Sequence, residues 1–339
     1  MPDLRVTLGP IALRNPVVCG AGEHVRTARD IRAVIEAGAA AVVAKSANES
    51  EAARRQADAT AWAFVGEDRA VVEQDAAGRA SIFNRSGLVQ EPWESWLALL
   101  AQADEHARRH DSWVVPSIIP GATAALPGLA AGVEAAGLRW LELNLSAPHA
   151  HDGLPGAAIE RPGEARRAAE LTRLVRDAVA IPVSVKLGIE HHDVTSLARA
   201  VHEAGADVIV MTGRHMAFLP DLRTRRPLLG SFGAYSGPWT LPLALRWVAK
   251  VRAALGPGVP LAGSNGARDG GDVARFLLSG ATAVQVASSV MIEGPGAIGR
   301  MLEELSAYLA EQGLDAMDLV GEAADAVITY EEAAMRAPR

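Results

Sequence analysis

The chain has 339 residues, of which 49% are hydrophobic and 22% are charged, and its formal net charge is −7. Proteins that bind nucleic acid backbones are normally basic, so this charge disfavours a nucleic acid as the main partner. The single cysteine, Cys19, excludes an intrachain disulfide and a cysteine-rich zinc or iron–sulfur centre. The N-terminal residues lack the apolar segment of a signal peptide, and no apolar run reaches the ~20 residues of a membrane span. We therefore expect a cytoplasmic protein.

Eight short segments rich in Val, Ile and Leu follow one another along the chain, with little alternation between apolar and polar residues. This pattern is typical of strands that are covered on both faces. The predicted strands are residues 15–20, 40–46, 113–119, 141–146, 182–188, 206–212, 259–266 and 282–289. Amphipathic segments lie between them, and the clearest predicted helices are residues 27–39, 163–179, 194–207 and 269–281.

Eight strands alternating with helices predict a single α/β domain over residues 1–339, a (β/α)8 TIM barrel. The alternative is an open doubly wound sheet. Its phosphate-binding glycines should follow the first strand, whereas the glycine-rich turns of this chain come later.

Two connections are longer than a barrel requires, residues 47–112 after the second strand and residues 213–238 after the sixth. Long segments in a compact domain are usually lids or binding loops. Both connections leave the C-terminal ends of strands, which is the barrel face where active sites lie. We therefore expect both to fold over that face.

Polar residues stand where several predicted strands end. Lys45 and Lys186 each close an otherwise apolar strand, and a buried lysine is costly unless it is paired. A salt bridge with a neighbouring carboxylate would explain one such lysine, whereas two at the same rim favour an anionic ligand. Gly266 and Ser288 follow the seventh and eighth strands, where TIM barrels commonly bind phosphate. Asn-Gly turns are also ordinary turn chemistry, so this second signal does not stand by itself.

Taken together, these segments resemble the dihydroorotate dehydrogenase family over roughly residues 4–312. The chain looks most like the soluble class of that family, and it is also similar to the FMN domain of dihydropyrimidine dehydrogenase. The matching segments are NPVVCGAGEH (15–24), KSAN (45–48), NRSGL (84–88), LNLSAPH (143–149), VKLG (185–188), GAYSGPWTLPLALRWV (233–248) and AGSNGARDGGDVARFLLSGATAVQVASSV (262–290).

The resemblance implies that the barrel holds FMN across its mouth and that hydride passes between flavin N5 and a substrate. The implied FMN-binding residues are Gly20, Ala21, Lys45, Ser46, Asn144, Lys186, Thr212, Ser236, Gly237, Asn265, Gly266, Ala287 and Ser288. The implied substrate-binding residues are Asn84, Gly87, Leu88, Asn144, His149, Gly213 and Arg214. A homodimer is expected because family members are often dimers.

The chain departs from the family at the catalytic base, which is Cys in the soluble class and Ser in the membrane-associated class. That position is Ala147, and a methyl group cannot accept a proton. Two substrate-binding asparagines of the family are replaced by His149 and Gly213. We therefore expect an FMN-dependent oxidoreductase that acts on a C–C or C–N bond of a small polar metabolite other than dihydroorotate. Its predicted catalytic residues are His149, Lys45 and Asn144.

His149 lies in the same loop as Ala147 and titrates near neutral pH, which suits a base or a proton donor. A solvated loop histidine is the equal alternative. Arg214 favours an acidic substrate because arginine makes bidentate contacts with carboxylate or phosphate.

Three other functions stay open. The first is a true dihydroorotate or dihydropyrimidine dehydrogenase that uses a different base. The second is a flavin-binding protein without turnover, and the third is a lyase that forms a Schiff base through Lys186 or Lys45. In each case we expect a small-molecule ligand and no metal, nucleic acid or membrane partner.

Overall fold

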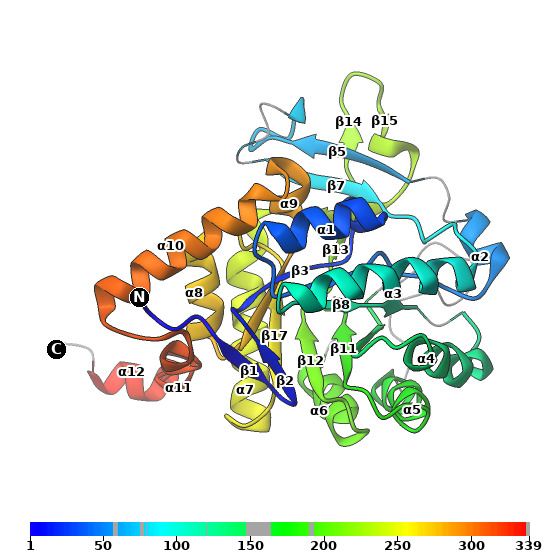
Figure 1. Ribbon diagram of the computed structural model, residues 1–339. Coiled ribbons are helices and arrows are strands. Elements are labelled where there is room, and N and C mark those ends of the chain that lie inside the picture. The colour runs from blue at the N-terminus through cyan, green and yellow to red at the C-terminus, as the bar shows by residue number, and fades with distance from the viewer. Residues whose placement is uncertain are drawn as a thin grey trace.

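A parallel sheet closes on itself at the centre of the molecule (Figure 1). The computed structural model describes residues 1–56, 60–74, 78, 80–119, 121–146, 164–189 and 193–336. In order around the sheet, the strands are β8 (Trp113–Val115), β4 (Ala41–Val43), β3 (Val17–Cys19), β18 (Ala283–Val286), β17 (Leu261–Ser264), β12 (Val208–Met211), β11 (Val183–Leu187), β10 (Leu141–Asn144) and β9 (Ser117–Ile118). Because β8 and β9 are two halves of one strand separated at Pro116, the sheet is an eight-stranded barrel. The predicted TIM barrel is confirmed.

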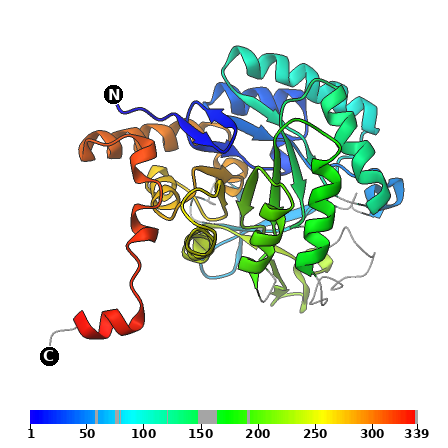
Figure 2. The same cartoon turned by 90° about the horizontal axis from the view of Figure 1, so that it is seen from below.

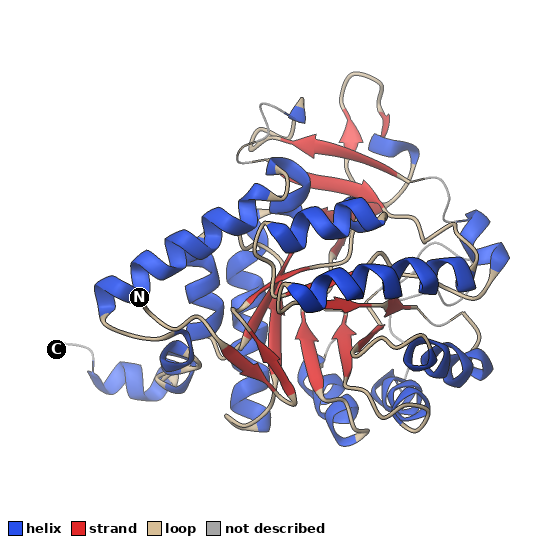
Figure 3. Ribbon diagram, in the orientation of Figure 1, coloured by secondary structure: helices blue, strands red, loops and turns tan. Residues whose placement is uncertain are grey.

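Helices pack around the outside of the barrel, as Figure 3 shows. They are α1 (Ala28–Glu36), α3 (Trp93–Arg109), α4 (Leu126–Ala135), α5 (Glu164–Arg176), α6 (Val194–Glu203), α7 (Leu241–Leu255), α8 (Gly270–Leu278), α9 (Ser288–Glu293) and α10 (Gly296–Gln312). Local sequence sets their ends. Thr27 and Asp30 form a capping box that starts α1, while Gly38 and Gly205 follow α1 and α6 with positive φ angles of 112° and 99°.

The two long connections contain regular structure. The first holds α2 (Glu51–Gln56), β5 (Ala61–Val65), β6 (Val71–Val72), β7 (Ser81–Arg85) and α3. The second holds β13 (His215–Ala217), β14 (Pro220–Asp221), β15 (Arg226–Pro227) and β16 (Gly233–Ser236). We did not expect α3 within residues 47–112, yet it is a helix of the outer layer that buries Trp96, Leu100 and Ala107.

Strands from both connections join into one five-stranded antiparallel sheet, in the order β13-β16-β7-β5-β6. We call it the accessory sheet. In Figure 1 it lies beyond the C-terminal ends of β11 and β12. The two connections thus build one structure above the barrel mouth.

The remaining elements lie at the other end of the barrel and beside it. The hairpin of β1 (Val6–Leu8) and β2 (Ile11–Leu13) precedes the barrel. At the other end of the chain, α11 (Glu322–Asp325) packs against α7 and α8, and α12 (Tyr330–Arg336) extends away from the barrel, as Figure 2 shows. Among the described residues, no helix is both long enough and apolar enough to span a membrane.

The barrel interior is not wholly apolar. Glu142 on β10 and Ser117 on β9 are fully buried, and Gln285 on β18 is almost fully buried. The Nε2 atom of Gln285 donates to Glu142 Oε2 over 2.7 Å, although β10 and β18 are not neighbours in the sheet. The hydrogen bond therefore crosses the barrel, and it forms a polar layer beneath the mouth.

Candidate functional site

A pocket with about 950 Å³ of empty space, partly open to solvent, lies between the barrel mouth and the accessory sheet. Every barrel strand contributes to its lining through the strand itself or the loop that follows it. The accessory sheet contributes Ile82 and Asn84 from β7 and Ser236 from β16. Residues from the whole circumference of the barrel and from the accessory sheet therefore meet at this one pocket.

Most of the residues predicted from the sequence line this pocket. They are Ala21, Lys45, Ser46, Asn84, Gly87, Asn144, Lys186, Thr212, Arg214, Ser236, Asn265, Gly266, Ala287 and Ser288. Four others do not line it but adjoin residues that do: Gly20, Leu88, Gly213 and Gly237. Ala147 and His149 lie outside the described residues.

Sequence reasoning missed several lining side chains, among them Glu23, Ser86, Gln285 and Met291. A signal for Glu23 existed, because it follows the first strand directly and a buried Lys45 requires a nearby negative charge. Ser86 stands inside the quoted NRSGL segment. Gln285 and Met291 carry no comparable signal, since they lie within a strand and a helix.

Lys45 forms a buried ion pair. Its Nζ atom lies 2.6 Å from Glu23 Oε1, and both side chains are only 6% exposed. The backbone N–H of Gly87 also donates to this oxygen, over 3.4 Å. Burial lowers the pKa of Lys45 to about 8, although the negative charge of Glu23 acts to raise it. The salt bridge that we considered for one lysine is therefore present at Lys45.

We expect Lys45 to titrate near pH 8 in the folded protein. The ordinary lysine pKa is 10.5, so between pH 8 and 10.5 the unfolded chain keeps a proton that the native protein has lost. The free energy of unfolding rises with pH wherever the unfolded state binds more protons. The contribution of Lys45 to stability should therefore increase as the pH rises through this window.

The measurement is direct, because only three of the 33 basic residues are lysines: Lys45, Lys186 and Lys250. Labelling the lysine ε-carbons gives three NMR signals, which single Lys→Met variants assign. The signal of Lys45 should titrate with a midpoint near pH 8. A midpoint near 10.5 would show that burial does not control this amine.

Lys186 is held by the polar layer inside the barrel. Its Nζ atom donates to Gln285 Oε1 over 2.8 Å, and Gln285 in turn donates to Glu142. The Ser117 hydroxyl donates to the second oxygen of Glu142 over 3.2 Å. Burial lowers the pKa of Lys186, while the charge of Glu142 opposes this shift. The network thus keeps an ammonium group at the bottom of the pocket.

Asn144 is fixed at the end of β10 by its own surroundings. Its Oδ1 atom accepts from the backbone N–H of Ser146 over 3.0 Å and from the Ser146 hydroxyl over 2.7 Å. Its Nδ2 atom donates to the Ser46 hydroxyl over 3.3 Å. The second amide hydrogen has no acceptor among the described residues, and Asn144 lines the pocket, so it is available to donate to a ligand.

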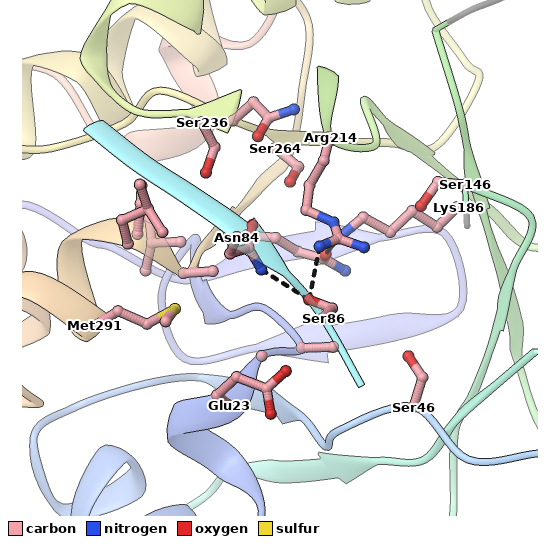
Figure 4. A pocket seen from close by; sticks show the side chains of 18 of the residues that line it. Glu23, Ser46, Asn84, Ser86, Ser146, Lys186, Arg214, Ser236, Ser264 and Met291 are labelled. Atoms are coloured by element: carbon pink, nitrogen blue, oxygen red, sulfur yellow. Dashed lines mark hydrogen bonds between the residues drawn. The ribbon is translucent and has the colours of Figure 1, made fainter. Parts of the chain in front are cut away.

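Arg214 enters the pocket from the segment after β12. Its Nη1 atom donates to the Ser86 hydroxyl over 2.6 Å, and Asn84 Nδ2 donates to the same oxygen over 2.8 Å (Figure 4). Burial lowers the pKa of Arg214, and the charge of Glu23 opposes that shift. An arginine pKa is high enough that the group stays charged, so the pocket holds a third cation.

Serine hydroxyls and a tight turn line the part of the pocket that follows β17 and β18. Asn265 and Gly266 follow β17 with φ angles of 79° and 95°. The Ser289 hydroxyl donates to the backbone oxygen of Ala267 over 2.7 Å and so ties this turn to the start of α9. Serine hydroxyls and backbone N–H groups in such turns bind phosphate oxygens well.

The barrel, the pocket at its mouth and the buried cations define a TIM-barrel protein with a positively charged pocket at the C-terminal ends of its strands. The family model described as dihydroorotate dehydrogenase matches residues 4–309. The chain therefore belongs to the dihydroorotate dehydrogenase family of oxidoreductases.

Two curated relatives align with nearly the whole chain, and a third is more similar over a shorter part. The catalytic subunit of dihydroorotate dehydrogenase B (NAD(+)) from Methanothermobacter thermautotrophicus is 30% identical over 327 residues, which is 95% of this chain and 99% of that protein. The subunit of the same name from Pyrococcus furiosus is 29% identical over 321 residues, 94% of this chain and 98% of the relative. The subunit of the same name from Desulforamulus reducens is 38% identical over 192 residues, which is 56% of this chain and 61% of that protein.

Proposed function

We propose that the protein is an FMN-dependent oxidoreductase that transfers hydride between flavin N5 and a C–C or C–N bond of a small polar metabolite other than dihydroorotate. The observation that carries the proposal is the pair of lysines, Lys45 and Lys186, at strand ends in one pocket. Family membership supports the class of reaction.

The lining residues suit FMN in charge and in hydrogen-bonding groups. Ser264, Ser288 and the Asn265–Gly266 turn would hold the phosphate, and Ala21 gives the flat ring access to backbone. Lys186 would lie against the polar edge of the ring, where a cation favours the reduced form. When bound, FMN would supply the two-electron acceptor and donor of the reaction.

The remaining predicted roles concern the substrate. Asn144 is fixed with a free amide hydrogen, which suits a hydrogen bond to the ring or the substrate. Lys45 faces the same pocket as half of an ion pair. His149 stays a predicted catalytic residue, because the loop around Ala147 is not among the described residues.

Two observations support a substrate other than dihydroorotate. Ala147 replaces the family's base. At Gly213, an added Cβ would lie 2.3 Å from the Cβ of Ser146, so the family's asparagine does not fit there unless Ser146 moves. A site that has lost a hydrogen-bonding partner discriminates strongly against the ligand that needs it.

The lyase alternative has less support than the flavoenzyme. A Schiff-base lysine needs a free amine, whereas Lys45 is paired with Glu23 and Lys186 is held by Gln285. Borohydride trapping with carbonyl compounds would detect such chemistry.

An FMN titration of the purified protein, followed by anaerobic reduction, tests the proposal. We expect saturable FMN binding with altered flavin absorbance. We expect dihydroorotate to leave the bound flavin oxidised, whereas a panel of small saturated cyclic amides and amines contains a compound that reduces it. Protein that stays colourless with FMN would contradict the proposed cofactor. Rapid reduction of the bound flavin by dihydroorotate would contradict the proposal that the substrate is another metabolite.

The names of the relatives suggest which electron acceptors to test first. Because those proteins are named as NAD(+)-linked catalytic subunits, NAD+ and a partner subunit are the first acceptors to test. A homodimer in the cytoplasm remains our expectation, and light scattering of the FMN-loaded protein measures the assembly.

A further inference from the structure

The C-terminal part of the chain lies beyond the residues that the family model matches, which end at 309. It is first held firmly against the barrel. The guanidinium of Arg252 on α7 donates to both carboxylate oxygens of Asp325, over 2.8 Å and 2.7 Å. The backbone N–H of Gly321 donates to the backbone oxygen of Leu277 on α8 over 2.8 Å. The place where the chain leaves the barrel is therefore fixed beside α7.

Beyond α11 the chain extends away from the barrel. We call residues 326–336 the C-terminal arm. Its last part is α12, the red helix that stands apart from the rest of the molecule in Figure 2. Val327 and Met335 are both 74% exposed, and Ile328 is 38% exposed. Exposed large apolar side chains that gather on one segment mark an interaction site. The arm thus carries apolar surface that its own barrel leaves in water.

Local sequence defines the helix of the arm. The carboxylate of Glu332 accepts from the backbone N–H of Thr329 over 2.7 Å, and the Thr329 hydroxyl accepts from the backbone N–H of Glu332 over 3.2 Å. This reciprocal pair is a capping box, which starts a helix. Glu331 beside it is exposed. The arm therefore presents negative charge next to its apolar side chains.

Helix α7 carries the opposite charge. It contains three basic and no acidic residues, in a chain whose net charge is −7. Arg252 is neutralised by its ion pair with α11. Arg246 and Lys250 are exposed instead, and their cationic groups lie 4.6 Å and 5.8 Å from the ring centroid of Trp247. Leu243, one turn earlier, is 43% exposed. Residues three and four apart share one side of a helix, so these four residues form one surface, the α7 face.

We propose that the C-terminal arm docks on the α7 face of a second copy of this chain. Arg246 and Lys250 pair with Glu331 of the other copy, and the apolar side chains of the arm cover Leu243 and Trp247. Because α11 packs against α7, the arm leaves the barrel close to this face. A two-fold axis beside α7 then places each arm on the other copy, so the same contact forms twice. The contact lies outside the pocket and goes beyond the proposed function.

Carbodiimide crosslinking tests the contact directly, because the reagent joins an amine to a carboxylate that touches it. Of the three lysines, Lys250 is exposed, whereas Lys45 and Lys186 line the pocket. Equal amounts of unlabelled and isotope-labelled full chain are mixed while dilute enough to dissociate, and are then concentrated. We expect peptides that join Lys250 to Glu331, with mixed-isotope pairs as frequent as same-isotope pairs. If the crosslink is absent, or occurs within single copies, the arm does not dock on a second copy.

Charge reversal followed by sedimentation equilibrium tests the same contact in the full chain. We expect Arg246→Glu/Lys250→Glu to weaken association of the chain by about tenfold or more, because like charges then face each other at both symmetric contacts. Glu331→Lys should weaken it for the same reason. All three substitutions in one chain restore opposite charges, so this triple variant should associate more tightly than either parent.

The matched control is Arg166→Glu/Arg173→Glu, which reverses two exposed arginines on α5 in the same outer layer and should leave association unaltered. A wild-type protein that stays monomeric, or a triple variant no tighter than its parents, would refute the arm contact. None of the substituted residues lines the pocket, so every variant should bind FMN like the wild type. Loss of the arm contact and failure of the proposed flavin function are therefore observed separately.

Discussion

Replacing Lys186 with methionine is expected to weaken FMN binding by about 10- to 100-fold, because a buried hydrogen bond to a charged group is worth ~1.5–3 kcal/mol. The ammonium of Lys186 is held in the pocket by Gln285 and is charge-balanced by Glu142 beneath it. Methionine has a similar length and supplies neither the charge nor the donor. Flavin absorbance or fluorescence titration of each protein measures the loss.

Lys250→Met is the matched control, since Lys250 is an exposed residue of α7 that does not line the pocket. It should bind FMN like the wild type. In Lys186→Met, the flavin that does bind should also have a more negative reduction potential, because the cation that favours the reduced form is gone. Wild-type affinity and potential in Lys186→Met would exclude this lysine from the cofactor site.

Removing the carboxylate of Glu142 is expected to destabilise the protein by about 3–5 kcal/mol in Glu142→Ala, because it leaves the buried cation of Lys186 without its counter-charge. The change also removes the acceptor for Gln285 and Ser117 inside the barrel. Urea unfolding followed by circular dichroism gives the free energy of unfolding of each variant.

Two further variants separate charge from hydrogen bonding at this position. Glu142→Gln keeps both hydrogen bonds, since its amide oxygen can accept from Gln285 and its NH2 can donate to the Ser117 hydroxyl. It should therefore cost less than Glu142→Ala. Adding Lys186→Met to Glu142→Gln removes the unpaired cation and should recover stability relative to Glu142→Gln. Additive effects of the two substitutions would show that the two charges are not coupled.

Local sequence was sufficient for the framework of the fold. The apolar segments that end in Lys45, Asn144 and Lys186 are strands of the barrel, and glycine stands after α1 and α6 where the helix ends require it. Because parallel strands of a barrel all end at one face, side chains distant in the sequence could be assigned to one site.

Residues 93–109 show the limit of that reasoning. They lie in a segment expected to be a loop, yet they form α3 of the outer layer. Residues 81–85 and 233–236 pair as β7 and β16 of the accessory sheet, across about half of the chain. Neither segment buries a face by itself, so their pairing depends on contacts that only the folded chain provides.

The sequence by itself determined the barrel, the end at which the site lies, and the two lysines that line it, because the hydrophobic period and strand-end position are local properties. It also showed that Ala147 cannot act as a base, because that is a property of the residue type. Only the tertiary structure decided the partners of these charges. Glu23 pairs with Lys45 and keeps one oxygen free, while Glu142 reaches Gln285 and Lys186 across the barrel interior. The physical reason is that an ion pair or a hydrogen bond depends on separation in space, and closing the barrel brings together Gln285 and Glu142, which are 143 positions apart in the chain.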